Sequence, residues 1–388
     1  MLKSWLCGVD ILFLMFLVLL LGVGLFILST ASFNVYPGDP YHYVKLQSAW
    51  IVTGIILAVL VASVDYRAYR GIAWWIYGLN IVLLLTVIVF GQSALGATRW
   101  IKITSSISIQ PSEFAKILII VTLADFIAKR HGRLNRYRDF IAPFTFVLVP
   151  MILVYKQPDL GTTLVFMAIF ICMMFMAGAN PWKFGSLLLG GILIIGMALW
   201  LHFATNLPYW LHFAQGMPLP MQDYQLQRLI VFVNPAADNS GSGYNILQSI
   251  WAIGSGGLWG KGYRMGTQTH LNFLPERQTD FIFAVVGEEF GFMGAVTLLF
   301  CFFIFISRAI YITKNANELY GILIGTGIVS MLTFHIMVNV GMSSGIMPVT
   351  GIPLPFISYG GSTLWSIMLA VGLLLSINKR NNTYLFKI

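Results

Sequence analysis

Long apolar runs constrain the fold of this chain more than any other feature. A helix needs about 20 consecutive apolar residues to cross the hydrocarbon core of a bilayer. Ten runs approach this length, at about 11–30, 46–64, 72–90, 111–128, 140–155, 160–178, 184–203, 280–307, 319–340 and 359–377. Only 10% of the residues are charged, against about 25% in a soluble domain. We expect an all-α integral membrane protein with about ten transmembrane helices, forming a single polytopic domain over residues 1–388.

Three polar stretches interrupt this pattern. Residues 204–277 contain five prolines and many polar groups, so we expect a large, partly membrane-associated loop between helices 7 and 8. Residues 91–110 read as a polar loop, and residues 341–358, with three prolines, as a kinked loop lying on the membrane. The first apolar run is too long for a typical signal peptide, and the three cysteines show no disulfide or metal-binding spacing.

Basic residues predict the orientation of the chain. Lys and Arg exceed Asp and Glu by nine, but they lie in loops between apolar runs, which indicates membrane topology and not nucleic-acid binding. One face holds 14 of them and the other holds 9, namely Lys45, Arg99, Lys102, Lys116, Lys156, Arg228, Lys261, Arg264 and Arg277. The denser face should be cytoplasmic. Both termini are then cytoplasmic, and the three polar stretches face outward.

Asp280 stands at the outer end of the eighth run. Acids inside apolar segments are costly and indicate function by default. In one continuous helix, Ala284, Gly287, Gly291 and Gly294 would lie within about 40° of Asp280, forming a stripe of small residues. The alternative is that Asp280 is only a helix N-cap, and the two roles are compatible.

Two further acids, Glu288 and Glu289, follow in the same run. A straight helix would place them about 12–14 Å deeper than Asp280. They would need partners there, either Lys116 or polar atoms of neighbouring helices. We favour a structural role between helices for both acids.

Glu113 and Lys116 are three residues apart and share a helix face. One interpretation is a local ion pair. The other is that Lys116, with basic residues of the same outer face, binds an anionic substrate such as a phosphate or pyrophosphate, and the spacing does not decide between them. Asp159 is expected to cap a helix. His335 and Asn339, four residues apart, are expected to make hydrogen bonds between helices.

Five motifs together resemble one known family. They are GATRWI, QPSEFAK, QPDLGT, the run GSGGLWGKG…LPERQTDFIFAVVGEEFG, and GIMPVTGIPLPFISYGGS. In this order they are similar to the SEDS family of RodA, FtsW and SpoVE proteins. The sequence LPER before the acid resembles the RodA elongation branch more than the FtsW division branch. GMSSG before IMPVTG departs mildly from the family pattern.

The resemblance implies a peptidoglycan glycosyltransferase of the bacterial cytoplasmic membrane. Such proteins polymerise lipid II, a disaccharide-pentapeptide on undecaprenyl pyrophosphate, at the outer face. Their partners are a class B penicillin-binding protein, which crosslinks the product, and other elongation-complex proteins. The family's essential aspartate corresponds to Asp280.

The chemistry implied by the resemblance assigns roles to residues. An inverting transfer needs a base for the acceptor hydroxyl and stabilisation of the departing pyrophosphate. We expect Asp280 to be the general base. Basic residues, a divalent cation such as Mg²⁺ or Mn²⁺, or both would stabilise the pyrophosphate. The residues expected to bind substrate are Arg99, Glu113, Lys116, Lys261 and Arg277.

Three alternatives remain at this stage. A lipid II flippase would show an inverted repeat and broken helices at the midplane, and the sequence has no clear repeat. A non-catalytic scaffold for the crosslinking enzyme would not need Asp280. A division-branch polymerase would share the same chemistry.

Overall fold

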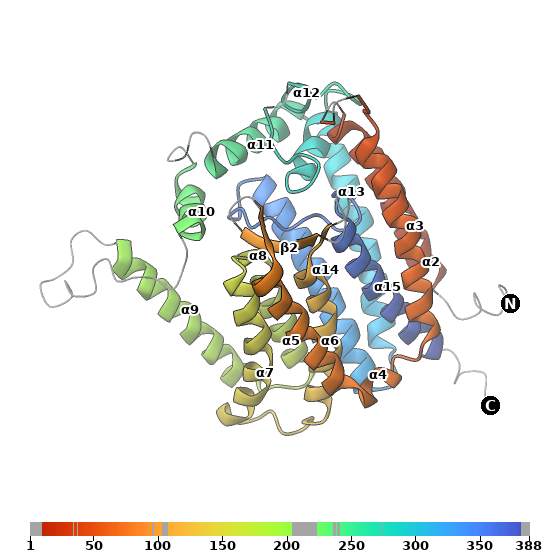
Figure 1. The fold of residues 1–388 in the computed structure, drawn as a ribbon, viewed down its shortest axis with the longest axis vertical. Helices are drawn as coiled ribbons and strands as arrows, with labels where there is room; N and C mark the ends of the chain where they lie inside the picture. Colours follow the sequence, from red (N-terminus) through yellow and green to blue (C-terminus); the bar gives the residue numbers. More distant parts are fainter. Residues whose placement is uncertain are drawn as a thin grey trace, which may run out of the picture.

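A computed structural model describes residues 10–33, 35–36, 38–94, 97–102, 108–203, 223–235, 238, 241–271 and 273–381. It is a helical bundle whose long helices run along a common axis (Figure 1). Among the described residues, eight helices are long and apolar enough to cross a membrane. They are α2 (Ile11–Ala31), α3 (His42–Ser63), α5 (Ala73–Phe90), α7 (Tyr137–Lys156), α9 (Pro181–Phe203), α13 (Ile282–Lys314), α14 (Leu319–Ser343) and α15 (Gly361–Asn381).

The remaining two expected spans are also helical. They are α6 (Pro111–Ala128), which carries Glu113, Lys116 and Asp125, and the shorter apolar helix α8 (Leu160–Met176). Each of the ten expected spans therefore overlaps a helix. The predicted class of an all-α, multi-pass membrane protein is confirmed.

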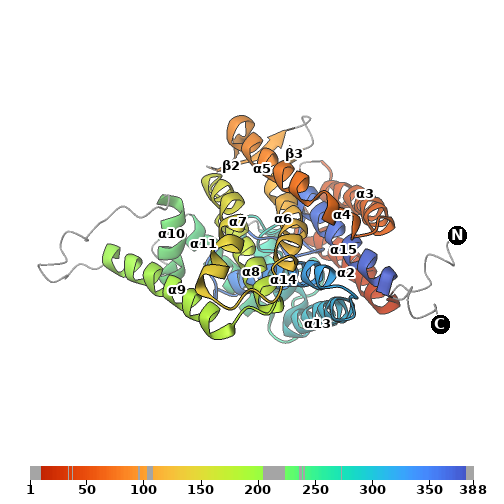
Figure 2. The same ribbon diagram turned by 90° about the horizontal axis from the view of Figure 1, so that it is seen from below.

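The interior of the bundle is formed by α6, α14 and α15, whose side chains are largely buried. Small residues let these helices approach their neighbours: Gly372 of α15 faces the Ala58 carbonyl of α3, and Gly327 of α14 faces Ile120 of α6. Such contacts are typical of packing inside membranes, where close approach replaces the hydrophobic effect. By contrast, α9 leans away from the bundle (Figures 1 and 2), and few of its residues are buried.

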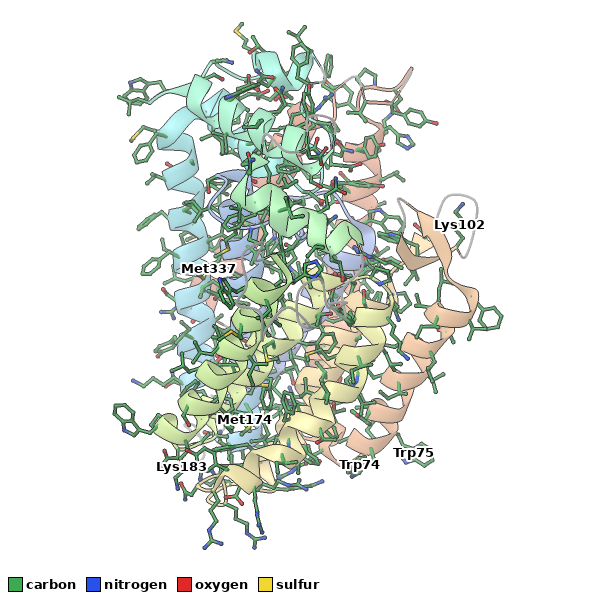
Figure 3. The ribbon with its side chains drawn as sticks, turned by 90° about the vertical axis from the view of Figure 1, so that its left-hand side faces the viewer. Trp74, Trp75, Lys102, Met174, Lys183 and Met337 are labelled. Atoms are coloured by element: carbon green, nitrogen blue, oxygen red, sulfur yellow. The ribbon has the colours of Figure 1, made fainter. Side chains whose placement is uncertain are left out.

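The two ends of the bundle differ in chemistry. One end holds α4 (Ala68–Gly71) and three ion pairs, Arg67–Glu318, Arg70–Asp125 and Arg380–Asp65. Lys183, Trp74 and Trp75 lie near this end, whereas Lys102 lies toward the other (Figure 3). The opposite end carries the helices of the long loop, α10 (Asp223–Val233), α11 (Ser242–Gly256) and α12 (Thr267–His270) (Figure 1). The start of this loop, 204–222, lies outside the described residues.

The expected polar loop at 91–110 contains a small antiparallel sheet instead. Its strands are β1 (Gln92–Ala94), β2 (Ala97–Lys102) and β3 (Ser108–Ile109), in the order β1-β2-β3. The segments TRWIK and SI are rich in β-branched and aromatic residues, which favour strands. We expected no strand because the Gly and Ser residues between these segments dominated the pattern. Strand β2, which carries Arg99, contacts α6.

The proline-rich segment 341–358 does not lie on the membrane as expected but enters the bundle. Phe356 and Ile357 are buried, and the Phe356 carbonyl packs against Gly24 of α2. Backbone groups freed by the prolines find partners inside the protein, which irregular backbone at membrane depth requires. Asn339 Nδ2 donates to the Ile352 carbonyl over 2.9 Å, and the Leu354 amide donates to Ser358 Oγ over 2.9 Å.

A break at Gly291 divides α13 into a short segment and a long one. Gly291 has φ +66° and ψ −164°, which no helix contains. The loop between α11 and α12 fills the break: the amides of Lys261 and Gly262 donate to the carbonyls of Glu288 and Glu289 over 3.0 and 2.9 Å. In turn, the amide that follows Gly291 donates to the Gly257 carbonyl over 2.9 Å. The predicted stripe of small residues is therefore not continuous, because the helix changes direction within it.

The break also changes where the two glutamates lie. Glu289 accepts hydrogen bonds from Thr30, next to the end of α2, and from the Arg264 amide. Glu288 accepts from the Gln268 amide and from Thr269, both in α12. Both acids thus lie at the end of the bundle that carries α11 and α12. The expectation that they lie deeper than Asp280 is wrong, because it assumed one straight helix.

Candidate active site

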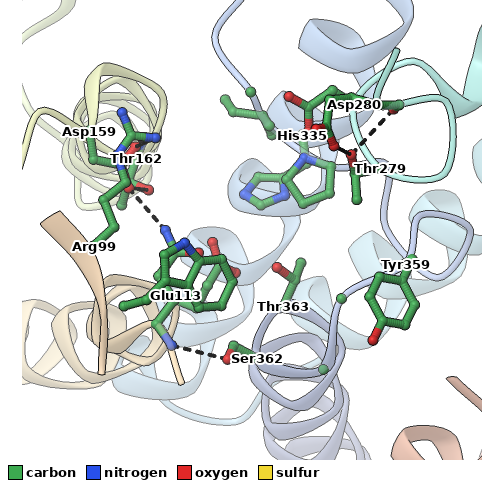
Figure 4. Close-up of a pocket in the computed structure, with 18 of the residues that line it drawn as sticks. Arg99, Glu113, Asp159, Thr162, Thr279, Asp280, His335, Tyr359, Ser362 and Thr363 are labelled. Carbon is green, nitrogen blue, oxygen red and sulfur yellow. Dashed lines mark hydrogen bonds and ion pairs between the residues drawn. The ribbon is translucent and has the colours of Figure 1, made fainter. Parts of the chain in front are cut away.

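A cavity of about 680 Å³ opens among segments that are far apart in the sequence. Its walls come from the sheet, the first turns of α6 and α8, helix α10, the turn before α13, the middle of α14 and the segment 349–365. Four of the six residues expected to form the site line it: Arg99, Glu113, Lys116 and Asp280. In Figure 4, Arg99 and Asp159 lie on one side, Asp280 and Thr279 on the other, and His335 between them.

Asp280 occupies the turn immediately before α13. The backbone of this turn is held by Asn339 Nδ2, which donates to the Asp280 carbonyl over 2.9 Å, and by Ser358 Oγ, which donates to the Thr279 carbonyl over 2.6 Å. The N-cap position of α13 is Phe281, and no side chain caps it. The alternative interpretation, that Asp280 is the N-cap of the helix, is therefore wrong. Its half-buried carboxylate lines the cavity.

The surroundings of Asp280 make it a stronger base than an exposed aspartate. Burial, and after it the nearby Glu276 carboxylate, raise the pKa of its carboxyl from 3.8 to about 6. The positive charges of Arg228 and Arg99 act in the opposite direction. General bases work best when their pKa lies near the pH at which they operate. Asp280 meets this condition close to neutral pH.

Glu113 and Lys116 form a buried charged pair with a third partner. Lys116 Nζ lies 2.8 Å from Glu113 Oε1 and 3.1 Å from His335 Nε2. Ser366 Oγ donates to the second Glu113 oxygen over 3.3 Å. The two interpretations of the Glu113–Lys116 spacing are compatible, because the ion pair exists and both members also line the cavity. The prediction that His335 makes an interhelix hydrogen bond is confirmed.

Asp159 connects three walls of the cavity. It caps α8, as expected, by accepting hydrogen bonds from the Thr162 amide and hydroxyl over 3.1 and 2.9 Å. It also accepts from Gln110 and Ser112 at the start of α6, over 3.2 and 3.3 Å. Arg99 lies 3.9 Å away and donates to the Pro158 carbonyl. Asp159 therefore fixes the position of Arg99.

Lys261 and Arg277 are not among the residues that line the cavity. Lys261 Nζ pairs with Glu288 over 2.7 Å. Arg277 is buried and donates to the carbonyls of Ala31 and Phe33 over 2.8 and 3.3 Å. Both residues hold together the end of the bundle that carries α11 and α12, whereas we had expected them to bind substrate. We expected these two residues to bind substrate only because the sequence placed them on the same side of the bilayer as Asp280. That placement cannot tell which residues of this side line the cavity.

Comparisons with known proteins agree with these motifs. The family model of FtsW, RodA and SpoVE, described as "Cell cycle protein", matches residues 10–383. The chain belongs to the FtsW/RodA/SpoVE family.

Curated relatives cover nearly the whole chain. Peptidoglycan glycosyltransferase RodA of Treponema pallidum is 35% identical, over 96% of this chain and 98% of that protein. Peptidoglycan glycosyltransferase MrdB of Escherichia coli strain K12 is 37% identical, over 88% of this chain and 87% of that protein. A solved chain, from work on polymerization and crosslinking by a peptidoglycan synthase complex, has a TM-score of 0.78 at 27% identity. That likeness covers 96% of this chain and 98% of the solved one.

In this FtsW/RodA/SpoVE protein, the motifs that carried the resemblance converge on one cavity. GATRWI supplies Arg99, QPSEFAK supplies Glu113 and Lys116, and QPDLGT supplies Asp159. LPERQTDFIF supplies Asp280, and the last motif supplies the wall at 349–362. A site assembled from so many segments explains why the motifs are short and widely separated.

Sequence reasoning missed several residues of the cavity wall. From the sequence, we assigned Arg228 to the outer face but not to the site. No sequence pattern indicates that the helix carrying Arg228 packs near Asp280. Trp50, Tyr359 and Trp365 form an aromatic wall, with the Trp50 and Trp365 rings edge-to-face at 5.1 Å. In the sequence these rings could not be told from ordinary residues of a membrane span.

A metal site made by the protein alone is not evident in the part of the chain that the structure describes. No group of three or more His, Cys, Asp or Glu side chains there is placed to hold an ion. Mg²⁺ is commonly held by one or two carboxylates together with substrate phosphates. Asp280 and Glu276 are the carboxylates on the same wall that fit such a shared site.

Proposed function

We propose that this protein is a peptidoglycan glycosyltransferase that polymerises lipid II into glycan strands during cell elongation. The observation that carries the proposal is its 35–37% identity, along most of its length, to proteins of that named activity. The site supports it independently. A half-buried carboxylate with a raised pKa faces a cavity that also presents cations, as a transfer from a sugar pyrophosphate requires.

The reaction follows from the chemistry of the substrate. The 4-hydroxyl of one sugar attacks the anomeric carbon of another, forming a glycosidic bond with inverted configuration. The bond from that carbon to the pyrophosphate breaks, and undecaprenyl pyrophosphate leaves with the electron pair. Asp280 accepts the proton of the attacking hydroxyl. A divalent cation, when bound, would supply further charge for the leaving group.

The cavity end of the bundle faces outward in this proposal. The cation-rich turn between α6 and α7 then lies in the cytoplasm, as the distribution of Lys and Arg predicts. Both chain termini are cytoplasmic, and the membrane is the bacterial cytoplasmic membrane. A class B penicillin-binding protein is the expected partner. This agrees with the similar solved chain, which comes from work on coordinated polymerization and crosslinking.

Polymerisation of labelled lipid II by the purified protein, with and without the partner, tests the proposal. Gel-resolved glycan strands are expected from the wild type. Asp280→Asn keeps the size of the side chain and removes the base, so it should reduce polymerisation by at least about a hundredfold. Wild-type rates from a folded Asp280→Asn variant would show that Asp280 is not the base. If the wild type moves lipid II across vesicles without polymerising it, the protein is a flippase.

A further inference from the structure

Helix α14 carries two buried polar residues, His335 and Asn339, one turn apart on the same face. From the sequence we expected them only to make hydrogen bonds between helices, and the reaction proposed above uses neither of them. Both make their contacts at the site, however. His335 lies within hydrogen-bond distance of Lys116, and Asn339 donates to the turn that carries Asp280. The contacts of Asn339 bear directly on where the base is held.

Asn339 uses its side-chain amide to join two segments. Its Nδ2 atom donates to the Asp280 carbonyl over 2.9 Å and to the Ile352 carbonyl over 2.9 Å. Both partners are carbonyl oxygens, which only accept, so the NH₂ group with its two hydrogens must face them. One carbonyl belongs to the turn before α13 and the other to the cavity wall at 349–354. A single, fully buried residue therefore fixes the turn against this wall.

The two carbonyls before that of Asp280 are also held from outside the turn. Ser358 Oγ donates to the Thr279 carbonyl over 2.6 Å, and the Tyr359 amide donates to the Gln278 carbonyl over 2.9 Å. Asp280, Thr279 and Tyr359 lie on the same side of the cavity (Figure 4). Loops usually move more than the elements they connect. Hydrogen bonds to three successive carbonyls restrict that motion in this turn.

The wall that Asn339 holds also covers the carboxylate of Asp280. Gly351 precedes Ile352, and a Cβ atom at Gly351 would lie 3.4 Å from Asp280 Oδ2. The backbone of the wall is therefore close to the carboxylate itself. Without the amide of Asn339, the turn and the wall could separate and water could surround the carboxylate. Hydration favours the charged form, so Asp280 would become a weaker base.

We propose that Asn339 is the positioning residue for Asp280, holding the carboxylate beside the wall at 349–354, where it meets the acceptor hydroxyl. The proposal rests on the function proposed above, in which Asp280 accepts a proton. Asn339 is not among the residues that line the cavity. It therefore acts through Asp280 and not by contact with the substrate.

The pH dependence of polymerisation by Asn339→Leu tests this assignment. Leucine has about the size of asparagine but donates no hydrogen bond. We expect kcat to fall about 10- to 100-fold, with a smaller change in KM, because the base is displaced. The midpoint of the pH profile should move from near 6 toward 3.8, the ordinary value for aspartate. Asn339→Gln keeps an amide donor and should lose less of kcat. The charged neighbours of Asp280, namely Glu276, Arg228 and Arg99, are the same in both variants.

Two controls separate positioning from a general loss of packing. Asn80 of α5 is fully buried, has no hydrogen-bond partner among the described residues and does not line the cavity. Asn80→Leu is therefore the matched substitution, and it should leave kcat and the pH midpoint unchanged. His335→Leu removes a polar contact of α14 one turn from Asn339, but to Lys116. It should lower the rate without moving the pH midpoint.

Ser358→Ala decides the question if Asn339→Leu does not fold. It removes the donor to the neighbouring Thr279 carbonyl, so the midpoint should move in the same direction by a smaller amount. Ser358→Thr keeps the hydroxyl and should shift the midpoint less. The thermal unfolding midpoint shows which variants are folded. The assignment is overturned if the folded variant, Asn339→Leu or in its place Ser358→Ala, keeps the wild-type kcat and a midpoint near 6. It is also overturned if His335→Leu moves the midpoint as far.

Carbodiimide labelling measures the ionisation of Asp280 without catalysis. An apolar carbodiimide reacts with protonated carboxyl groups, and peptide mass spectrometry gives the extent of labelling of Asp280 at each pH. If the wild type does not polymerise lipid II, but its labelling midpoint falls in Asn339→Leu, the function is contradicted and the positioning role is supported. If the wild type polymerises lipid II, and Asn339→Leu keeps both the rate and the labelling midpoint, the reverse holds.

Discussion

Asp280 owes its chemistry to neighbours that are distant in the sequence. Burial in the turn before α13 and the Glu276 carboxylate raise the pKa of its carboxyl, while two arginines from other elements oppose this change. The sequence identified the acid because charged residues are rare in apolar runs. The pKa could not be predicted, because it depends first on burial and then on neighbours such as Arg228 and Arg99, which only folding brings to the same cavity.

The pH dependence of polymerisation should report the ionisation of Asp280. The folded-state pKa of about 6 lies above the ordinary value of 3.8. The active carboxylate should therefore be present above pH 7 and be lost as the pH falls through about 6. Initial rates measured from pH 4.5 to 8.5 should rise to a plateau with a midpoint near 6. In Glu276→Gln the midpoint should move to lower pH, because a nearby negative charge is removed. A midpoint near 4 in the wild type would contradict this environment.

Removing one member of the buried pair Glu113–Lys116 should lower the free energy of unfolding more than replacing both members. Lys116→Met leaves the Glu113 carboxylate, 4% exposed, without its 2.8 Å partner. Such an unpaired buried charge costs about 3–5 kcal/mol. The double variant Glu113→Gln/Lys116→Met should recover much of this stability, measured as the free energy of unfolding in detergent. Equal losses in the single and double variants would show that the pair is not coupled.

At the scale of elements, the broken helix α13 shows where sequence periodicity fails. A run of apolar residues with glycines predicts one straight helix, and nothing local in GEEFGFMGA indicates a break. The break is stable because the glycine-rich loop before α12 supplies hydrogen bonds to both sides of Gly291. The sequence shows both Gly291 and the glycine-rich loop before α12, but it does not show that the two are in contact. The same contact explains Lys261, which pairs with Glu288 across this loop.

Gly291→Ala should disrupt this junction. A Cβ atom at Gly291 would lie 2.3 Å from the Gly260 amide nitrogen, and its φ of +66° is costly for alanine. We expect a loss of more than about 2 kcal/mol in unfolding free energy and a large fall in polymerisation, because the short segment after Asp280 would lose its anchor. Gly190→Ala in α9 is the control. A Cβ there meets nothing within 4 Å, so about 1 kcal/mol of stabilisation is expected from helix propensity. Equal behaviour of the two variants would argue against the junction.

At the scale of the whole molecule, apolar length predicted the helices and their order, because the bilayer demands about 20 residues for each crossing. The interior of the bundle was less predictable. Segment 341–358 has the composition of a surface loop, yet Ile357 is fully buried. The segment can enter the bundle because the side chains of Asn339 and Ser358 make hydrogen bonds to its backbone. A hydropathy profile does not show which side chains will make hydrogen bonds to a buried backbone. The cavity is therefore a property of the assembled bundle, formed where this segment meets the turn before α13.

The proposed orientation of the whole bundle predicts which residues are reachable from outside the cell. Met265, 68% exposed, lies in the loop before α12, and Arg133 is exposed in the turn between α6 and α7 at the other end. In a background in which Cys7, Cys172 and Cys301 are replaced by serine, Met265→Cys should react with a membrane-impermeant maleimide in intact cells. Arg133→Cys should react only after the cells are permeabilised. The reverse pattern would place Asp280 at the cytoplasmic face, where a polymerase of exported lipid II could not meet its substrate. Labelling of both variants in detergent controls for sites covered by a partner.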